Sequence, residues 1–325
     1  MKNKMMRVFG MLGIFALAFT FTANAQTKAD AAQKYNDGVT AYNAKNYAAA
    51  ITAFKGALDI AAKVGDEAND VVEGVGKLLP MSYLQNSLIQ AKTKNYTGAV
   101  ASVKEAIAVG EKFNDQTAVS KANNLLPQLY RLMGNQELGA NNFEKAIEYY
   151  RVGLQLNPDA TNSLLGIGLA YSKMNKLDSS LAYFDKCIEV GKRTNKLDEV
   201  EKATMQARDI LLEMASAEEK NKNYEAAIEE YNDVLKYAPQ SEIAYYKLAF
   251  CNYSISKWDE AEVAANKALE YTLNPTEKGK IYFMLAGIGE AKKDIPMACD
   301  NYTKAQVDPK YKAQAAARKT ALKCQ

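Results

Sequence analysis

The chain has 325 residues, of which 48% are hydrophobic, with 41 Lys and Arg residues, 38 Asp and Glu residues and no histidine. Without histidine the sequence lacks the commonest general base and the commonest metal ligand, so we expect no catalytic site, metal or cofactor. The near balance of charge lacks the basic excess of a nucleic-acid-binding protein, so we expect no nucleic-acid partner.

The first 25 residues have the three parts of a secretory signal peptide. Three basic residues precede an apolar run over residues 8–21, and small residues at 23 and 25 favour cleavage after Ala25. A retained membrane anchor is the alternative, although 14 apolar residues are few for a bilayer that needs about 20. Cleavage would leave 38 residues of each charge. We expect an exported protein, with the periplasm as the favoured compartment and no integral membrane segment after cleavage.

Residues 26–325 carry a repeated pattern, in which an aromatic residue is followed by Ala three places later and by another aromatic four places after that. Tyr47, Ala50 and Phe54 form one copy. The Ala place recurs at separations of 49, 47, 34, 47, 34 and 37 residues, and its members are Ala50, Ala99, Ala146, Ser180, Ala227, Ala261 and Ala298. This spacing is one buried face of a helix, repeated, so we predict an array of helix pairs.

The 34-residue separation is the length of a tetratricopeptide repeat, and the chain resembles that family over nearly all of residues 26–325. Pro158 and Pro239 stand where the family places a helix-ending proline. The resemblance implies an all-α fold, a right-handed superhelical α-solenoid of antiparallel helix pairs with a C-terminal capping helix. The repeats are expected at roughly residues 31–64, 80–113, 127–160, 161–194, 208–241, 242–275 and 279–308, with the cap at 309–325.

Three separations exceed 34 residues by more than ten, by 15, 13 and 13. Two of the extra segments contain nearly the same phrase, at residues 78–83 and 125–130, each with a central proline, Pro80 or Pro127. Proline inside a helix costs about 3 kcal/mol, so each segment is either a separate short helix or a first helix that is lengthened and kinked. We favour the lengthened, kinked helix. The third segment, near residues 197–208, has no proline and is expected to run straight.

Short polar pairs separate the two helices of a repeat. Asn tolerates the left-handed backbone conformation that ends a helix, so we predict that these pairs are the turns within the repeats. The pairs are Lys45-Asn46, Lys94-Asn95, Asn141-Asn142 and Lys222-Asn223.

The four cysteines show no metal-binding or redox spacing. Cys187 and Cys251 fall on predicted core positions, and we expect buried free thiols there. The helix that contains Cys299 should end near residue 308, and the returning helix then brings Cys324 back beside it. We therefore predict a Cys299–Cys324 disulfide, whose loop of roughly 25 residues would contribute about 3 kcal/mol on the chain-entropy model.

The resemblance also implies where a partner binds, in the concave groove lined by the first helices. The family's groove places fall here on Tyr35, Val39, Tyr42, Met81, Leu84, Leu88, Gln128, Arg131, Asn135, Leu165, Leu169, Tyr246, Phe250, Tyr253 and Phe283. Members that bind chaperone tails hold a terminal carboxylate with Lys or Arg and Asn, and only Arg131 and Asn135 match that clamp. Both ends of the groove are aromatic and apolar, which suits an amphipathic helix or an extended peptide. In the alternative, these rings pack against neighbouring helices.

These observations favour a non-enzymatic periplasmic scaffold that binds a protein or peptide, with assembly of the envelope or of secretion machinery as a special case. The alternative is a carbohydrate- or nutrient-binding accessory of an outer-membrane uptake system, since related helical repeats support such proteins. The single tryptophan, Trp258, falls on a predicted core position and argues against that alternative.

Overall fold

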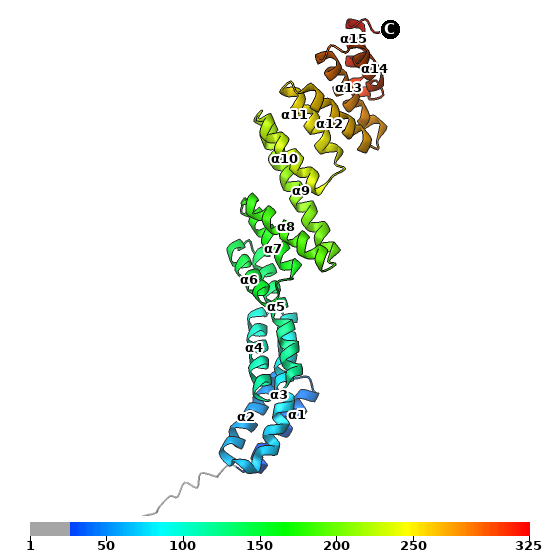
Figure 1. Ribbon diagram of the computed structural model, residues 1–325. Helices are drawn as coiled ribbons and strands as arrows, with labels where there is room; N and C mark the ends of the chain where they lie inside the picture. Colours follow the sequence, from blue (N-terminus) through cyan, green and yellow to red (C-terminus); the bar gives the residue numbers. More distant parts are fainter. Residues whose placement is uncertain (1–26) are drawn as a thin grey trace, which may run out of the picture. The chain divides into compact units, whose positions relative to one another are not determined.

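The structure is a computed structural model that describes residues 27–325, which form fifteen α-helices and one 3₁₀ helix (Figure 1). The predicted signal peptide, residues 1–25, lies outside the described residues. The helices are α1 (Lys28–Asn43), α2 (Tyr47–Val64), η1 (Asp66–Ala68), α3 (Asn69–Lys92), α4 (Tyr96–Lys112), α5 (Gln116–Gly139), α6 (Phe143–Leu156), α7 (Thr161–Lys173), α8 (Leu177–Arg193), α9 (Leu197–Lys220), α10 (Tyr224–Tyr237), α11 (Glu242–Ser254), α12 (Trp258–Tyr271), α13 (Pro275–Ala291), α14 (Ile295–Ala305) and α15 (Pro309–Ala321). Within residues 27–325, none of these helices combines the length and the apolar character that a bilayer span requires.

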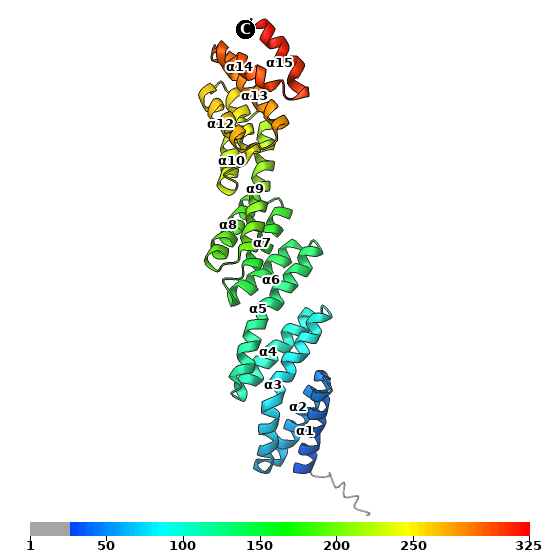
Figure 2. The same ribbon diagram turned by 90° about the vertical axis from the view of Figure 1, so that its right-hand side faces the viewer.

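The helices form two compact units. The first holds the described residues up to Thr93 together with Ala101–Asn123, and the second holds Lys94–Val100 together with Asn124–Gln325. In the first unit α2 packs against both α1 and α3. In the second, each helix from α6 to α14 packs against the next one in the chain, and α15 lies beside α13 and α14 (Figure 2). The all-α array of helix pairs with a terminal capping helix is therefore present.

The buried positions of the array follow the predicted repeat. All seven members of the Ala place, including Ser180, have no exposed surface. The large residues four places later, such as Phe54, Tyr150 and Tyr231, are also fully buried. Because Ala and Ser leave room at the helix crossing, the two helices of a pair approach closely, and the ring then fills the space beside them.

A second small residue, 16 places before each large one, completes this core. A Cβ atom added at Gly38 would lie 2.6 Å from the Phe54 ring, and one added at Gly134 would lie 2.6 Å from the Tyr150 ring. Ala215 occupies the same place before Tyr231 and is fully buried. The rings therefore need a small residue on the first helix as well as on the second.

Three first helices are long. Helices α3, α5 and α9 each have 24 residues, whereas α7 and α11 each have 13. Pro80 and Pro127 lie inside α3 and α5, so the extra segments are extensions of the first helices, as predicted, and not separate short helices. The kink at these prolines stays a prediction.

The turns between paired helices lie at the four predicted pairs, but Asn is the left-handed residue in only one of them. The left-handed residue is Lys45, Lys94 or Lys222 in three of the four pairs, with φ between 60° and 64°, and it is Asn only at Asn141. The Asn that follows instead stands at the N-cap of the next helix. Asn46, for example, has φ −88° and its side chain accepts a hydrogen bond from the Ala49 N–H at 3.3 Å. Asn is favoured there because its short side chain can satisfy an unpaired helix N–H.

Candidate functional site

Three aromatic residues lie on one side of α11, which is in contact with the next first helix, α13. Ser241 begins α11 by accepting the Ala244 N–H at 3.2 Å, and α13 begins with Pro275 at its first turn, where proline is favoured. The aromatic residues, Tyr246, Phe250 and Tyr253, are four and three residues apart, so they share one side of α11. Helices α11 and α13 are in contact, and Tyr246 and Tyr253 lie against residues of α13. We call Tyr246, Phe250, Tyr253 and Phe283 the ring surface.

Each ring of α11 has a partner from another helix. The Lys280 ammonium lies 5.3 Å from the centre of the Tyr246 ring. The Tyr253 ring lies edge-on to Trp258, with centroids 5.0 Å apart, and would be within 4 Å of a Cβ atom added at Gly287. Tyr246 and Tyr253 are half-buried, so they take part in the core on one side and remain accessible on the other.

Phe250 and Phe283 complete the ring surface. Phe250 lies edge-on to Tyr224 of α10, with centroids 6.1 Å apart. Phe283 lies 5.3 Å from Tyr302 of α14 and 5.0 Å from Tyr311 of α15. Both are half-buried. Each of these four rings therefore packs against a neighbouring helix and also keeps some exposed area. Contact with a partner stays a prediction.

The charged groups beside the rings are paired with one another. Glu219 accepts hydrogen bonds from Lys247 and from the Tyr231 hydroxyl, both at 2.7 Å. Lys280 forms an ion pair with Glu277 at 2.6 Å. Burial raises the pKa of Tyr246, and nearby Tyr311 and Glu219 raise it further, so its hydroxyl is neutral at physiological pH. The surface thus presents rings and hydroxyls with no net excess of charge from these pairs.

The first unit has a similar arrangement between α1 and α3. The Tyr35 ring lies so close to Gly74 of α3 that an added Cβ atom would be 2.9 Å from it, and the ring centroid is 5.9 Å from that of Phe54. Tyr42 lies edge-on to Tyr47 at 5.4 Å. Tyr35, Val39 and Tyr42 are half-buried, as are the rings of α11.

Two of the predicted groove residues belong to the core instead. Leu84 is only 4% exposed and Leu165 only 9%, so both offer a partner almost no surface. Each lies on the side of its first helix that packs inward. Leu88, one turn after Leu84, is 40% exposed and remains a surface residue, and Gln128 is also exposed. Met81 and Leu169 are half-buried.

Arg131 and Asn135, the pair that matches the carboxylate clamp, also interact with a buried tyrosine of the fold. The Tyr150 hydroxyl donates a hydrogen bond to Oδ1 of Asn135 at 2.7 Å, and Arg131 lies near the same ring. Burial raises the pKa of Tyr150 to about 12, so the hydroxyl keeps its proton and this bond persists at neutral pH. Asn135 is exposed, with Nδ2 as its remaining donor. A full clamp would need further cations from neighbouring repeats.

Sequence reasoning missed Lys280, Gly287 and Tyr311 as neighbours of the ring surface. The first two could have been found from the repeat itself, because Lys280 follows Tyr246 by 34 residues and Gly287 follows Tyr253 by 34. Residues one repeat apart occupy equivalent places on adjacent first helices and therefore meet. No such rule gives Tyr311, which belongs to the cap.

The hollows in the second unit lie elsewhere. One of about 500 Å³ is formed by α8, α9 and α10, with Leu181, Asp185 and Tyr237 among its lining residues. Another, of about 670 Å³, is formed by α10, α11 and α12 and includes Ile228 and Val263. None of the predicted groove residues lines either of them. The ring surface is therefore separate from these two pockets. It is an extended area on which a segment of another chain could lie.

Comparison with known proteins finds tetratricopeptide repeats in the part of the chain that holds helices α7 to α13. Two family models described as Tetratricopeptide repeat match residues 161–190 and 212–277. A model described as Anaphase-promoting complex subunit 5 matches residues 35–134.

Relatives and a solved structure show the same kind of likeness. Protein O-mannosyl-transferase TMTC1 of Homo sapiens is 28% identical over 130 residues, which is 38% of this chain and 14% of that protein. TPR repeat-containing protein MJ1428 of Methanocaldococcus jannaschii is 25% identical over 271 residues, 83% of this chain and 41% of that protein. The chain thus spans less than half the length of either relative. The TPR2AB-domain:pHSP90-complex of yeast Sti1 matches with 16% identity over 90% of this chain and 97% of that chain, at a TM-score of 0.35.

Proposed function

The chain is a tetratricopeptide repeat protein, and from that premise we propose that it is a non-enzymatic scaffold that binds an apolar segment of another protein on the ring surface of α11 and α13. The observation that carries this proposal is the set of half-buried rings, Tyr246, Phe250, Tyr253 and Phe283, on adjacent first helices. Rings held by the core lose little conformational freedom on binding, and burial of their exposed parts supplies the driving force.

The charges around the rings support an apolar partner over an acidic one. Lys280 lies 5.3 Å from the centre of the Tyr246 ring and Lys247 is next to Tyr246 in sequence, and each already has a carboxylate partner within 2.7 Å. An acidic peptide would have to compete with Glu219 and Glu277 for them, whereas an apolar side chain displaces only water from the rings. The apolar face of an amphipathic helix or the alternate side chains of an extended peptide would fit this requirement.

Export to the periplasm is part of the same proposal. The N-terminal residues have the sequence of a signal peptide, and the structure joins Cys299 to Cys324 in a disulfide. Structural disulfides persist in oxidising compartments and are rare in the cytosol of most organisms. Both features support an exported scaffold.

The test removes ring area while leaving the fold in place. The mature chain, residues 26–325, would be used to capture partners from an envelope extract, with quantitative mass spectrometry as the readout. Replacement of Tyr246 and Phe250 by Ser should weaken capture by about 30-fold or more, since single truncations at such centres cost about 2 kcal/mol or more. Val263→Ser on α12, at a residue that is 66% exposed, is the matched control and should change nothing.

A second variant blocks the surface without removing any ring. Gly287→Leu adds a side chain whose Cβ would lie 3.7 Å from the Tyr253 hydroxyl, an ordinary contact, so the fold should accept it. The added side chain would cover part of the rings, and capture should fall while the melting temperature stays near wild type. Capture that survives both variants would exclude the ring surface. Binding on a glycan array without a captured protein would favour the nutrient-binding alternative.

A further inference from the structure

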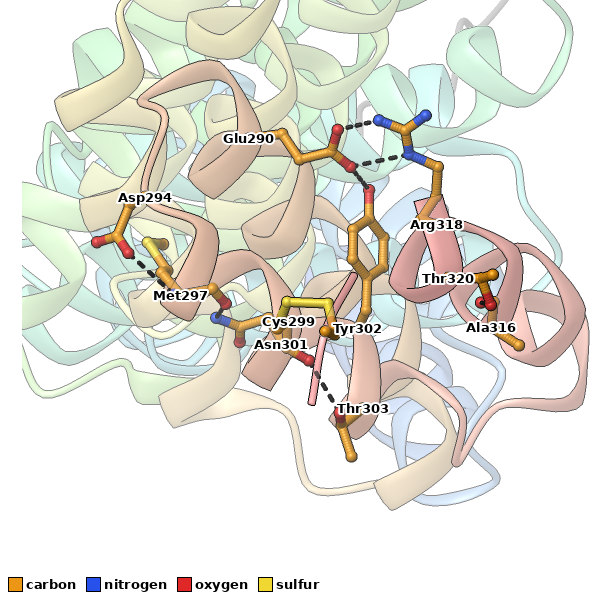
Figure 3. Close-up of a disulfide and its surroundings, with 11 residues drawn as sticks. Glu290, Asp294, Met297, Cys299, Asn301, Tyr302, Thr303, Ala316, Arg318 and Thr320 are labelled. Carbon is orange, nitrogen blue, oxygen red and sulfur yellow. Dashed lines mark hydrogen bonds and ion pairs between the residues drawn. A yellow bond between two sulfur atoms is a disulfide. The ribbon is translucent and has the colours of Figure 1, made fainter. Parts of the chain in front are cut away.

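The capping helix α15 is held to the array by few contacts besides a disulfide. Ala315 is the one residue of α15 that is buried, and Tyr311 is half-buried. Arg318 forms an ion pair with Glu290 of α13, which also accepts a hydrogen bond from the Tyr302 hydroxyl (Figure 3). By comparison, α14 buries four residues in a shorter helix. Helix α15 therefore buries fewer residues than α14, although it is the longer helix.

The disulfide fixes the end of α15 that is farthest from its turn. Cys324 follows α15 and bonds to Cys299 of α14, with Cα atoms 5.5 Å apart and a sequence separation of 25 (Figure 3). The other end is the short turn at Asp308, which approaches Gly279 so closely that a Cβ atom there would clash with it. Helix α15 is thus attached to α14 at both ends, at its start by the turn at Asp308 and after its end by the disulfide.

Helix α15 covers part of the ring surface. The Tyr311 ring lies 5.0 Å from the Phe283 ring, and Tyr311 is also near enough to Tyr246 to contribute to its raised pKa. Phe283 belongs to α13 and Tyr246 to α11, the two helices that carry the ring surface. A partner segment that extended along the rings to Phe283 would therefore compete with Tyr311 for that ring.

The bridging sulfurs differ from the other two in accessibility. Cys299 and Cys324 are half-buried, whereas Cys187 and Cys251 are fully buried free thiols. Burial raises the pKa of Cys187 to about 11 and that of Cys251 to about 12, so neither is an effective nucleophile at neutral pH. A reductant should act on the bridge and leave the core thiols unchanged.

We propose that α15 is a lid over the C-terminal end of the ring surface and that reduction of the Cys299–Cys324 disulfide releases it. A dithiol reductant attacks one bridging sulfur and forms a mixed disulfide, and its second thiol then displaces that sulfur. Cys299 and Cys324 leave as two thiols, and the reductant, which has supplied two electrons and two protons, becomes a disulfide. The consequence for partner binding rests on the proposed function, whereas the opening of the lid does not.

The size of the effect follows from the loop that the bridge closes. On the chain-entropy model, opening a loop of 25 residues raises the relative population of the released form on the order of a hundredfold. A partner that needs Phe283 uncovered would bind more tightly by up to the same factor, because its apparent affinity is limited by the fraction of open molecules.

The first experiment measures the lid alone, by hydrogen exchange of residues 309–325 in the mature chain with and without dithiothreitol. Amides of α15 should exchange on the order of a hundredfold faster after reduction, while those of α7 and α8 should not change. Cys324→Ser should exchange fast in both conditions. Unchanged protection of α15 after complete reduction, verified by mass, would overturn the proposal.

The second experiment asks whether the lid covers an apolar surface, with the dye 1-anilinonaphthalene-8-sulfonate as the probe. Dye fluorescence should rise on reduction, and Phe283→Ala should remove most of that rise. Tyr311→Ser, which keeps the disulfide, should give part of the rise without reductant. Equal fluorescence in both redox states would overturn the lid, whereas capture through Tyr246 and Phe250 would still stand or fall by its own test.

Discussion

The repeats with short first helices and those with long ones share a core but are joined to the preceding repeat in different ways. Helices α7 and α11 follow the turns that contain Pro158 and Pro239, and no residue of these turns has positive φ. Helices α3, α5 and α9 follow turns in which Gly65, Asn114 and Asn195 are left-handed, with φ of 82°, 57° and 56°. A first helix of 24 residues therefore follows a turn with a left-handed residue, whereas a first helix of 13 residues follows a turn that contains proline.

Two of the long-helix junctions also share a close contact. A Cβ atom added at Gly110 would lie 2.8 Å from a methyl of Val119, and one added at Gly191 would lie 2.5 Å from a methyl of Val200. In both, the left-handed Asn follows the Gly by four residues and the Val follows it by nine. The preceding helix and the long helix cross at this Gly, so their extra turns pack together as a hairpin. The repeat period lengthens without any change in the core.

The largest expected effect tests whether the core is the same in both kinds of repeat. Phe184 belongs to a short-helix repeat and Tyr231 to a long-helix one, and both are fully buried in the second unit. Phe184→Ala and Tyr231→Ala should each lower the free energy of unfolding by about 3 to 5 kcal/mol, because each leaves a cavity beside a small residue. Urea unfolding followed by circular dichroism would measure both. A loss below about 1 kcal/mol for only one of them would mean that the two kinds of repeat do not share a core.

A smaller effect is expected where the two kinds of junction differ. Gly191→Ala places a methyl 2.5 Å from Val200 and 3.3 Å from the Lys196 carbonyl oxygen, so it should destabilise by roughly 1 to 2 kcal/mol after the gain in helix propensity. Gly153→Ala, in the helix before a proline turn, is the matched control. Its Cβ would be 3.4 Å from the nearest atom, so it should be neutral or stabilising by up to about 1 kcal/mol.

A double variant separates the clash from other causes. Val200→Ala removes the methyl groups that oppose residue 191, so the loss caused by Gly191→Ala should be smaller in the Val200→Ala background than in the wild type. Equal losses in the two backgrounds would show that the crossing at Gly191 does not constrain the junction.

The fold could be predicted from the residues that recur with the repeat. The Ala place and the ring four residues later gave the helix pairs, because a buried helix face repeats in sequence wherever the same packing repeats in space. The long helices α3, α5 and α9 were also predicted, from the excess lengths. The junctions were not, although the shared Val-Gly pair at 109–110 and 190–191, with Asn four residues after the Gly, is a visible signal.

The candidate site was less predictable, for a physical reason. Tyr246, Phe250 and Phe283 can be assigned to a first-helix face from spacing, but how much of each ring is exposed depends on what the next helix places against it. Leu84 is an example: its spacing predicted a groove residue, but its helix packs so that Leu84 is buried in the core. The cover of Phe283 by Tyr311 depends on α15, which has no counterpart in the repeats.

The smallest effect concerns the left-handed residue of the junction itself. Asn195 has φ 56°, a conformation that costs most side chains about 1 kcal/mol because Cβ approaches the backbone carbonyl, and that Asn and Gly tolerate. Asn195→Ala should therefore destabilise by about 1 kcal/mol, and Asn195→Gly should be neutral within about 0.5 kcal/mol. Gln240→Ala in a proline turn, where no left-handed residue is needed, should also be neutral within that range. The same urea unfolding measurement compares the three variants. A loss at Asn195→Gly as large as that at Asn195→Ala would mean that the Asn side chain, and not the backbone conformation, holds the long-helix junction together.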